Sequence, residues 1–379
     1  MRSTSIEQTR QTPFYRTLDY WLLIPVLCIC GISLYVLSFV LERRLPGGYP
    51  RNFIVQCASV VIGFTVMLLI AKLGVDKLRL VGWITYVLAV GLQLMLPLFG
   101  DQAIAARTGS NSWLKVPLVG SMQPSEFSKI ALLILVSFVL EGMLDNKYSY
   151  AKGAGLITLL VAPHFVLILG MQKDFGTAMV IVFMLAVMIF IWGIRLRYVV
   201  LAGSLMIIAI PLIWTFYLVE YQKKRILAFL YPGYDPDATY NVDQAKRAIA
   251  AGGLTGHRSG GHIDVPVQES DFIFSAVGEL LGFVGAAALI VLIFVFLLRA
   301  IYVSSKATTS ALRYMGAGVT SVFAVHSIEN IGMCLGLLPV TGIPLPFVSQ
   351  GGSAMVANFL SLGVLMAIVQ ERNQRQFTF

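Results

Sequence analysis

Long apolar runs separated by short polar segments make up nearly the whole chain. A membrane-spanning helix needs about 20 mostly apolar residues, because the hydrocarbon layer is about 30 Å thick and a helix rises about 1.5 Å per residue. Strands of a membrane barrel would instead show about ten alternating residues, so the predicted fold class is all-α. We expect a single polytopic membrane domain over residues 1–379. Its ten helices are predicted near residues 20–41, 52–72, 80–100, 126–144, 153–170, 175–194, 198–220, 272–298, 312–338 and 351–370.

Composition supports a membrane protein and excludes several other classes. Hydrophobic residues make up 57% of the chain and charged residues 12%, whereas soluble domains carry roughly a quarter charged residues. A soluble enzyme, a disordered scaffold and a nucleic-acid-binding domain are therefore excluded, despite a net charge of +9. The four cysteines and four histidines show no disulfide or metal-ligand spacing, so we expect no metal site.

The distribution of Lys and Arg predicts which side each loop faces, because cytoplasmic loops carry the excess of positive charge. With the N-terminus inside, the inner loops and tails are richer in Lys and Arg than the outer loops, once the long segment after the seventh helix is set aside. Both termini are therefore expected in the cytoplasm, as tails at residues 1–19 and 371–379. Residues 221–271 would form one long extracytoplasmic loop between the seventh and eighth helices.

Polar residues at membrane depth are costly, so each is a candidate for function. Glu126 and Lys129 lie three residues apart at the start of the fourth predicted helix, where they share a face and can pair. This pair would be either a structural ion pair or a source of positive charge for a phosphate. Ser125 is the expected N-cap of that helix, and Asp174 the expected cap of the sixth.

A second polar group lies where the long loop enters the eighth helix. Asp271, Ser275 and Glu279 are spaced four residues apart and predict one polar stripe along that helix. Asp271 would be either a helix cap or a general base at the membrane surface. Glu279 and Glu329 should face the bundle interior, and we interpret Glu329, with Asn330 beside it, as structural.

The long loop is rich in glycine between residues 252 and 261. Glycine suits a backbone that packs closely on a ligand or moves around it. A merely flexible surface loop is the simpler interpretation, and we favour it on this feature alone.

Six motifs occur in the order found in a known family: residues 123–129 (QPSEFSK), 173–177 (KDFGT), 231–236 (YPGYDP), 244–256 (ending GGLTG), 271–274 (DFIF) and 338–353 (LPVTGIPLPFVSQGGS). The chain resembles the SEDS family (shape, elongation, division and sporulation), the polytopic peptidoglycan glycosyltransferases of bacteria. Residues 339–344 favour the elongation branch of that family over the division branch. The chain departs from the usual pattern at Gln350, at Asn111, at His257 and at Val267.

The resemblance implies an enzyme that polymerises lipid II, the undecaprenyl-pyrophosphate-linked disaccharide peptide, at the outer face of the bacterial cytoplasmic (inner) membrane. This activity would serve cell-wall elongation and cell shape. The implied partners are a class B penicillin-binding protein (a transpeptidase) and membrane lipid, without nucleic acid. Asp271 matches the family's essential aspartate and would be the catalytic residue. The residues expected to bind substrate are Lys129, Glu126, Asp174, Trp113, Arg225, Gln244, Lys246, Arg247, Ser349 and Ser353.

Transfer from a pyrophosphate donor needs a base for the attacking hydroxyl, positive charge for the departing pyrophosphate, and a groove for two lipid-tailed sugars. Asp271 would be the base, and Lys129 would supply the charge. One base and one leaving group predict inversion, although Asp264 or Glu269 offers an alternative second carboxylate. The sequence requires no cofactor; a divalent cation (Mg or Mn) on the pyrophosphate would be compatible with the chemistry.

Two other functions remain open from the sequence. A transporter that flips lipid II would explain polar residues inside the helices, and we expect its essential charges near the midplane, at Glu279 or Glu329. A scaffold that only recruits the penicillin-binding protein is the third interpretation.

Overall fold

The computed structural model describes residues 14–44, 51–102, 104–105, 109–116, 120–231, 233–257 and 262–376. Its membrane-length helices are α1 (Tyr20–Arg44), α2 (Arg51–Leu73), α3 (Leu78–Leu94), α6 (Ser125–Leu144), α7 (Tyr150–Phe165), α8 (Phe175–Trp192), α9 (Leu196–Leu212), α12 (Ile273–Ser305), α13 (Ser310–Cys334) and α14 (Gly352–Gln376). Shorter helical elements are η1 (Phe14–Thr17), η2 (Val75–Lys77), α4 (Leu96–Phe99), η3 (Val166–Gln172), η4 (Ile213–Tyr217), α10 (Glu220–Leu230) and α11 (Pro236–Ala251). A two-stranded antiparallel hairpin joins β1 (Leu114–Val116) to β2 (Gly120–Met122).

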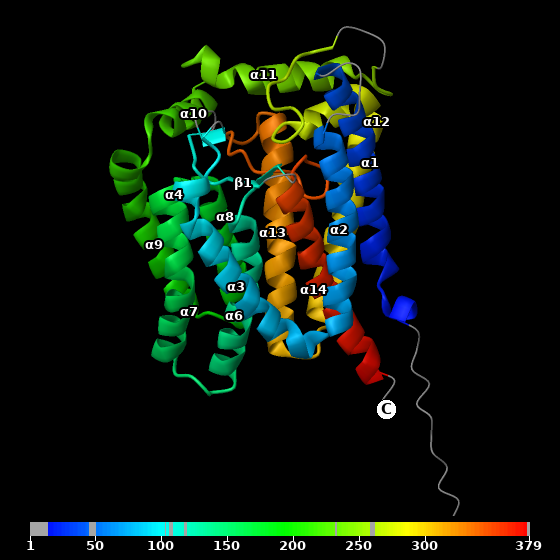
Figure 1. Ribbon diagram of the computed structural model, residues 1–379. Helices are drawn as coiled ribbons and strands as arrows, with labels where there is room; N and C mark the ends of the chain where they lie inside the picture. The colour runs from blue at the N-terminus through cyan, green and yellow to red at the C-terminus, as the bar shows by residue number, and fades with distance from the viewer. Residues whose placement is uncertain are drawn as a thin grey trace, which may run out of the picture.

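The long helices form one upright bundle, and α10 and α11 lie across one end of it (Figure 1). Among the described residues, eight helices are long and apolar enough to cross a membrane. The remaining two predicted spans are α3, which has 17 residues, and α13, which carries more polar side chains. The predicted all-α, polytopic membrane fold is therefore confirmed. The predicted N-terminal tail lies largely outside the described residues.

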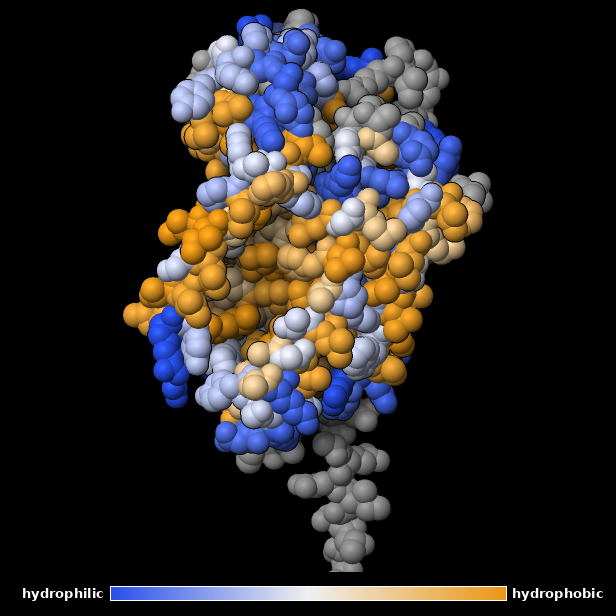
Figure 2. Space-filling view, turned by 90° about the vertical axis from the view of Figure 1, so that its left-hand side faces the viewer, coloured by the Kyte–Doolittle hydropathy of each residue, from blue (hydrophilic) through white to orange (hydrophobic). Residues whose placement is uncertain are grey.

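The surface of the bundle agrees with a membrane setting. Figure 2 shows an apolar band between two polar ends on the face that lies at the left in Figure 1, with a hollow in the band. Large apolar side chains of α9 and η4, such as Leu201, Ile207 and Phe216, are more than half exposed. Such a surface is stable in lipid but not in water, which supports a multi-pass membrane protein.

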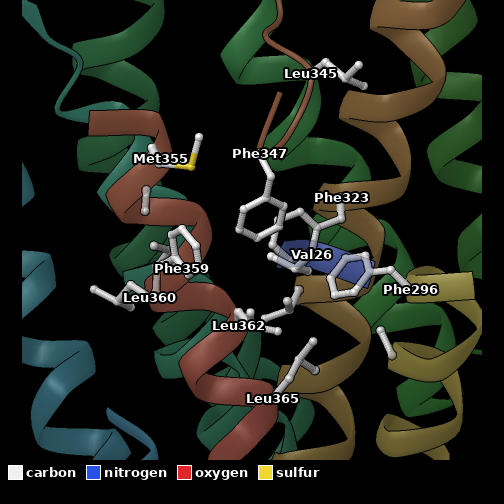
Figure 3. Close-up of a cluster of buried hydrophobic side chains, with 14 of the residues drawn as sticks. Val26, Phe296, Phe323, Leu345, Phe347, Met355, Phe359, Leu360, Leu362 and Leu365 are labelled. Carbon is white, nitrogen blue, oxygen red and sulfur yellow. The ribbon is translucent and has the colours of Figure 1, made fainter. Parts of the chain in front are cut away.

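Phenylalanine rings from four segments meet in the core (Figure 3). Phe347, in the loop between α13 and α14, lies 5.4 Å from Phe323, 5.2 Å from Phe359 and 6.1 Å from Phe296 between ring centroids. Phe347 has a φ of 61°, a left-handed conformation that is uncommon for a non-glycine residue. The buried ring anchors the loop at this position, so residues 338–344 of the same loop are held against the end of the bundle.

The described part of the glycine-rich stretch, residues 252–257, packs closely on α12. A Cβ atom at Gly252 would collide with the carbonyl oxygen of Gly278 in α12, and one at Gly256 with that of Leu280. The interpretation as a merely flexible loop is therefore wrong for residues 252–257, and residues 258–261 lie outside the described residues. Gly252 and Gly256 thus provide room for the α12 backbone.

A break in α12 explains why the loop packs there. Gly282 has a φ of 66° and interrupts the helix, which frees backbone groups that need new partners. The amide of Phe283 donates to the Gly253 carbonyl at 2.8 Å, and the amide of His257 donates to the Glu279 carbonyl at 2.9 Å. The loop thereby satisfies the broken turn and fixes the first two turns of α12.

Candidate functional site

A cavity of about 360 Å³ lies at the end of the bundle that carries α10 and α11. Its walls come from the first turns of α6 and α8, from α10, from α13, and from the loops before α12 and after α13. It brings together residues that are far apart in the sequence. Six of the predicted site residues line it: Trp113, Glu126, Lys129, Asp174, Arg225 and Asp271.

The Lys129 ammonium is the buried cation of this cavity. It donates to Glu126 Oε1 at 2.8 Å and contacts His326 Nε2 at 2.9 Å. Only 3% of Lys129 is exposed, and Glu126 is buried to a similar extent. The predicted pairing of Glu126 with Lys129 is confirmed. A buried charge needs such partners, because desolvation of an isolated ammonium costs several kcal/mol.

Asp174 caps α8, as predicted. Its Oδ1 accepts a hydrogen bond from the Thr177 amide at 3.0 Å. Its Oδ2 accepts hydrogen bonds from the Thr177 hydroxyl at 2.8 Å, from the side-chain amide of Gln123 at 2.9 Å and from the Ser112 hydroxyl at 3.2 Å. The carboxylate therefore joins the starts of α6 and α8 to the β1 segment and frames one wall of the cavity.

Asp271 lies in the turn before α12 and is half-buried. Its amide donates to the carbonyl of Val267 at 3.1 Å, and its own carbonyl accepts from the Asn330 side chain at 2.8 Å. The N-cap of α12 is Phe272, so the alternative in which Asp271 caps the helix is wrong. The backbone of Asp271 is thus fixed on both sides, while its side chain belongs to the cavity.

The predicted polar stripe on the eighth helix is not continuous. Asp271 precedes α12, so the helical spacing of four residues does not apply to it. Ser275 and Glu279 instead accept hydrogen bonds from the side-chain amide of Gln268, at 3.5 and 3.3 Å. Glu279 also contacts Arg43 at 3.3 Å. The two residues therefore belong to a separate cluster that ties the long loop to α1 and α12.

The prediction that Ser125 caps α6 is also wrong. The N-cap is Pro124, and the buried Ser125 hydroxyl has no hydrogen-bond partner among the described residues.

Five predicted substrate-binding residues lie outside the lining of this cavity: Gln244, Lys246, Arg247, Ser349 and Ser353. Gln244 and Arg247 lie on α11, where the Gln244 amide donates to the Tyr240 hydroxyl at 3.0 Å. Lys246 lines an adjoining cavity of about 140 Å³, which shares Arg225 with the first.

The two serines hold the loops that carry the site. The Ser349 hydroxyl donates to the Ser270 carbonyl at 2.6 Å and accepts from the Leu345 amide at 2.8 Å. The Ser353 hydroxyl accepts a hydrogen bond from the backbone amide of Gln123 at 3.1 Å. Both side chains are buried and act on the backbone next to cavity residues.

The structure adds cavity residues that were not among those predicted to bind substrate. His326 and Glu329 lie three residues apart on α13, and Lys173, with a left-handed φ of 56°, follows η3. The interpretation of Glu329 as an interior structural residue did not anticipate its position in the cavity. The helical spacing of His326, Glu329 and Asn330 (i, i+3, i+4) is the sequence signal that could have grouped them.

The cavity therefore combines carboxylates with cations. Glu126, Asp174, Asp271 and Glu329 face the same space as Lys129, Lys173 and Arg225. Such a site can take up a proton from a hydroxyl and stabilise a departing anion. Among the described residues, no three His, Cys, Asp or Glu side chains come together as a metal site. A divalent cation on the pyrophosphate, which the sequence allows without requiring it, stays untested.

Comparison with known proteins identifies the family. Residues 16–374 match the family FTSW_RODA_SPOVE, described as a cell cycle protein. The chain belongs to this family. Within the FTSW_RODA_SPOVE family, it is 30% identical over 323 residues to the peptidoglycan glycosyltransferase MrdB of Escherichia coli K12, which covers 84% of this chain and 85% of that protein. It is 29% identical over 319 residues to the probable peptidoglycan glycosyltransferase FtsW of Geobacter sulfurreducens, with 83% and 84% covered.

Solved structures agree with this family membership. One similar chain was solved in work on the structural coordination of polymerization and crosslinking by a peptidoglycan synthase complex. It has a TM-score of 0.77 and 25% identity, and 94% of this chain and 99% of that one are covered. The rod shape determining protein RodA of Thermus thermophilus shares the fold, with a TM-score of 0.68, 24% identity and 95% and 99% coverage. The family resemblance predicted from the six motifs is therefore confirmed.

Proposed function

We propose that this peptidoglycan glycosyltransferase uses the cavity at Asp271 and Lys129 to polymerise lipid II. The enzyme class agrees with the names of the relatives, MrdB and FtsW. The observation that carries the assignment of the site is the position of Asp271 and Lys129 in one cavity at the end of the bundle. A base and a cation in the same space are what transfer from a pyrophosphate donor requires.

In the proposed reaction, the Asp271 carboxylate takes the proton from the 4-hydroxyl of the acceptor sugar. The freed oxygen forms a bond to C1 of the donor sugar, while the bond from C1 to the pyrophosphate oxygen breaks. The electron pair leaves with undecaprenyl pyrophosphate, whose charge is stabilised by Lys129 and Arg225. This single displacement inverts C1, and general-base assistance of this kind contributes about 10²–10⁴-fold.

A second carboxylate from the long loop is not part of this proposal. Asp264 is exposed, and neither Asp264 nor Glu269 lines the cavity. A retaining mechanism would need a close pair of carboxyl groups about the reacting carbon.

The positions of the other acids bear on the transporter alternative. Glu279 lies outside the cavity lining and pairs with Arg43 and His262. Glu329 lines the same cavity as Asp271, so position alone does not separate a transporter from a polymerase. The polymerase is favoured because the relatives are named as glycosyltransferases.

The proposal includes a partner and a location. A class B penicillin-binding protein would cross-link the strands, in keeping with the similarity to a chain of a peptidoglycan synthase complex. The protein would lie in the bacterial inner membrane with both termini in the cytoplasm, so the cavity would open at the outer face.

The test is a gel assay of glycan strands made from purified lipid II by the full-length protein with its partner. Wild type should make long strands, Asp271→Ala should make none, and both should be folded. Asp264→Ala is the matched control, because it removes an exposed carboxylate of the same loop. Strand synthesis by Asp271→Ala at the wild-type rate would refute the assignment, and transport of lipid II without strand synthesis by wild type would favour the transporter.

A further inference from the structure

One face of α13 presents three polar side chains to the end of the bundle that holds the cavity. His326 contacts Lys129, and the Asn330 amide donates to the carbonyls of Asp271 and Ile343 at 2.8 and 2.9 Å. Glu329 lies between these two anchors in the sequence and lines the cavity. Its Oε2 atom is buried, and no hydrogen-bond donor in the described part of the chain reaches it.

Glu329 differs in this respect from two other carboxylates of the cavity. Glu126 accepts a hydrogen bond from Lys129, and Asp174 accepts four from the protein. A buried carboxylate oxygen that lacks a donor is costly, and such groups in folded proteins usually find a partner. The cavity itself can supply that partner when a ligand with a hydroxyl or N–H group enters it.

We propose that Glu329 is a substrate-binding residue that accepts a hydrogen bond from a sugar hydroxyl or acetamido N–H of lipid II. This inference rests on the proposed function and adds the orientation of the substrate. A pyrophosphate carries negative charge and acceptor oxygens, so a carboxylate repels it. Glu329 therefore binds a sugar group of the substrate, and the pyrophosphate is bound by the cations of the same cavity, Lys129 and Arg225.

The contact predicts a defect in binding that differs from the loss of a base. A hydrogen bond to a charged group, once removed, typically weakens binding about 10- to 100-fold. Glu329→Ala should raise KM for lipid II by that factor and leave kcat within about threefold of wild type. Glu329→Gln keeps an acceptor without the charge, so its KM should rise at least threefold but less than that of the Ala variant.

The experiment measures strand synthesis against lipid II concentration for the partner-bound, full-length protein. Binding of lipid II is measured in parallel in an Asp271→Asn background, where turnover does not contribute. Asp237→Asn is the control, because this exposed carboxylate at the start of α11 is not part of the cavity lining. Thermal unfolding of each variant checks folding.

The outcomes separate the two proposals. Unchanged KM and unchanged lipid II binding in Glu329→Ala would overturn the role of Glu329 while the polymerase assignment stands. A fall in kcat without a change in KM or binding would also overturn it. If the Ala variant fails to fold, the Gln variant decides: a KM raised at least threefold supports the contact, and an unchanged KM refutes it. Wild-type protein that makes no strands would refute the proposed function itself.

Discussion

Lys129 on α6 and His326 on α13 are joined by a 2.9 Å contact between Nζ and Nε2. Because an ammonium can only donate, Nε2 must accept, and the ring proton lies on Nδ1. That atom faces the carbonyl of Pro344 at 3.3 Å. The histidine thus links the buried cation to the loop that closes the cavity.

Loss of this acceptor should impair catalysis. His326→Ala leaves one donor of the Lys129 ammonium without its partner, which costs about 1–3 kcal/mol, and the cation loses its fixed position. We expect initial polymerisation rates at saturating lipid II to fall about tenfold or more. His326→Gln, which keeps an acceptor, should retain more activity, and His257→Ala, at an exposed side chain, should match wild type. Equal rates for His326→Ala and wild type would show that the contact is dispensable.

Close packing of the long loop on α12 should be sensitive to a single methyl group. Gly252→Ala places a Cβ against the Gly278 carbonyl, and overpacking of this kind costs about 1–3 kcal/mol. The neighbouring Gly253 has open space around its Cβ position, so Gly253→Ala carries only the cost of its φ of 53°, about 1 kcal/mol. We expect thermal unfolding to begin at a lower temperature in Gly252→Ala than in Gly253→Ala. Identical unfolding curves would contradict the packing described for this loop.

Asp174 should contribute to stability and to the cavity through different oxygens. Asp174→Ala removes the cap of α8, worth about 0.5–2 kcal/mol, and also releases Gln123 and Ser112. Asp174→Ser keeps an oxygen for the cap but loses the second carboxylate oxygen. Thermal stability should therefore recover in the serine variant, whereas strand synthesis should stay reduced in both. A wild-type unfolding temperature for Asp174→Ala would rule out the capping role.

Ser349 should act on the site indirectly. Ser349→Ala removes bonds to the Ser270 carbonyl and the Leu345 amide, leaving buried groups unpaired at a cost of about 1–3 kcal/mol. The expected result is a lower unfolding temperature and a lower kcat, because the turn that carries Asp271 loosens. Ser38→Ala is the control, since that hydroxyl donates to the Tyr35 carbonyl of its own helix. A raised KM for lipid II with unchanged stability would restore Ser349 as a substrate contact.

The fold could be predicted from the sequence because a helix that crosses the hydrocarbon layer must be long enough and apolar enough to do so. Both properties can be read directly from the sequence. The predicted run 312–338 became α13 (Ser310–Cys334), and the run 175–194 became α8 (Phe175–Trp192). Local pairs within one turn, such as Glu126 with Lys129, were equally accessible.

Features set by tertiary contacts could not be predicted in the same way. His326 reaches Lys129 across 197 positions of sequence, and no local pattern specifies that approach. The N-cap of α6 depends on the residue at which the backbone becomes helical. The helix begins at Ser125 itself, so Pro124 is the N-cap, and the Ser125 hydroxyl has no partner among the described residues. The role of Gly252 depends on its contact with the α12 backbone, which the sequence does not show. The number of glycines in the loop therefore suggested flexibility.

In the proposed reaction, the Asp271 carboxylate accepts the proton of the attacking hydroxyl. Asp271→Asn tests it most directly, because the amide keeps the shape of the side chain but is not a base. The decisive measurement is kcat for strand synthesis from purified lipid II by the partner-bound protein. We expect a loss of about 100-fold or more, with lipid II binding and unfolding temperature close to wild type. A kcat equal to that of wild type would show that Asp271 is not the base.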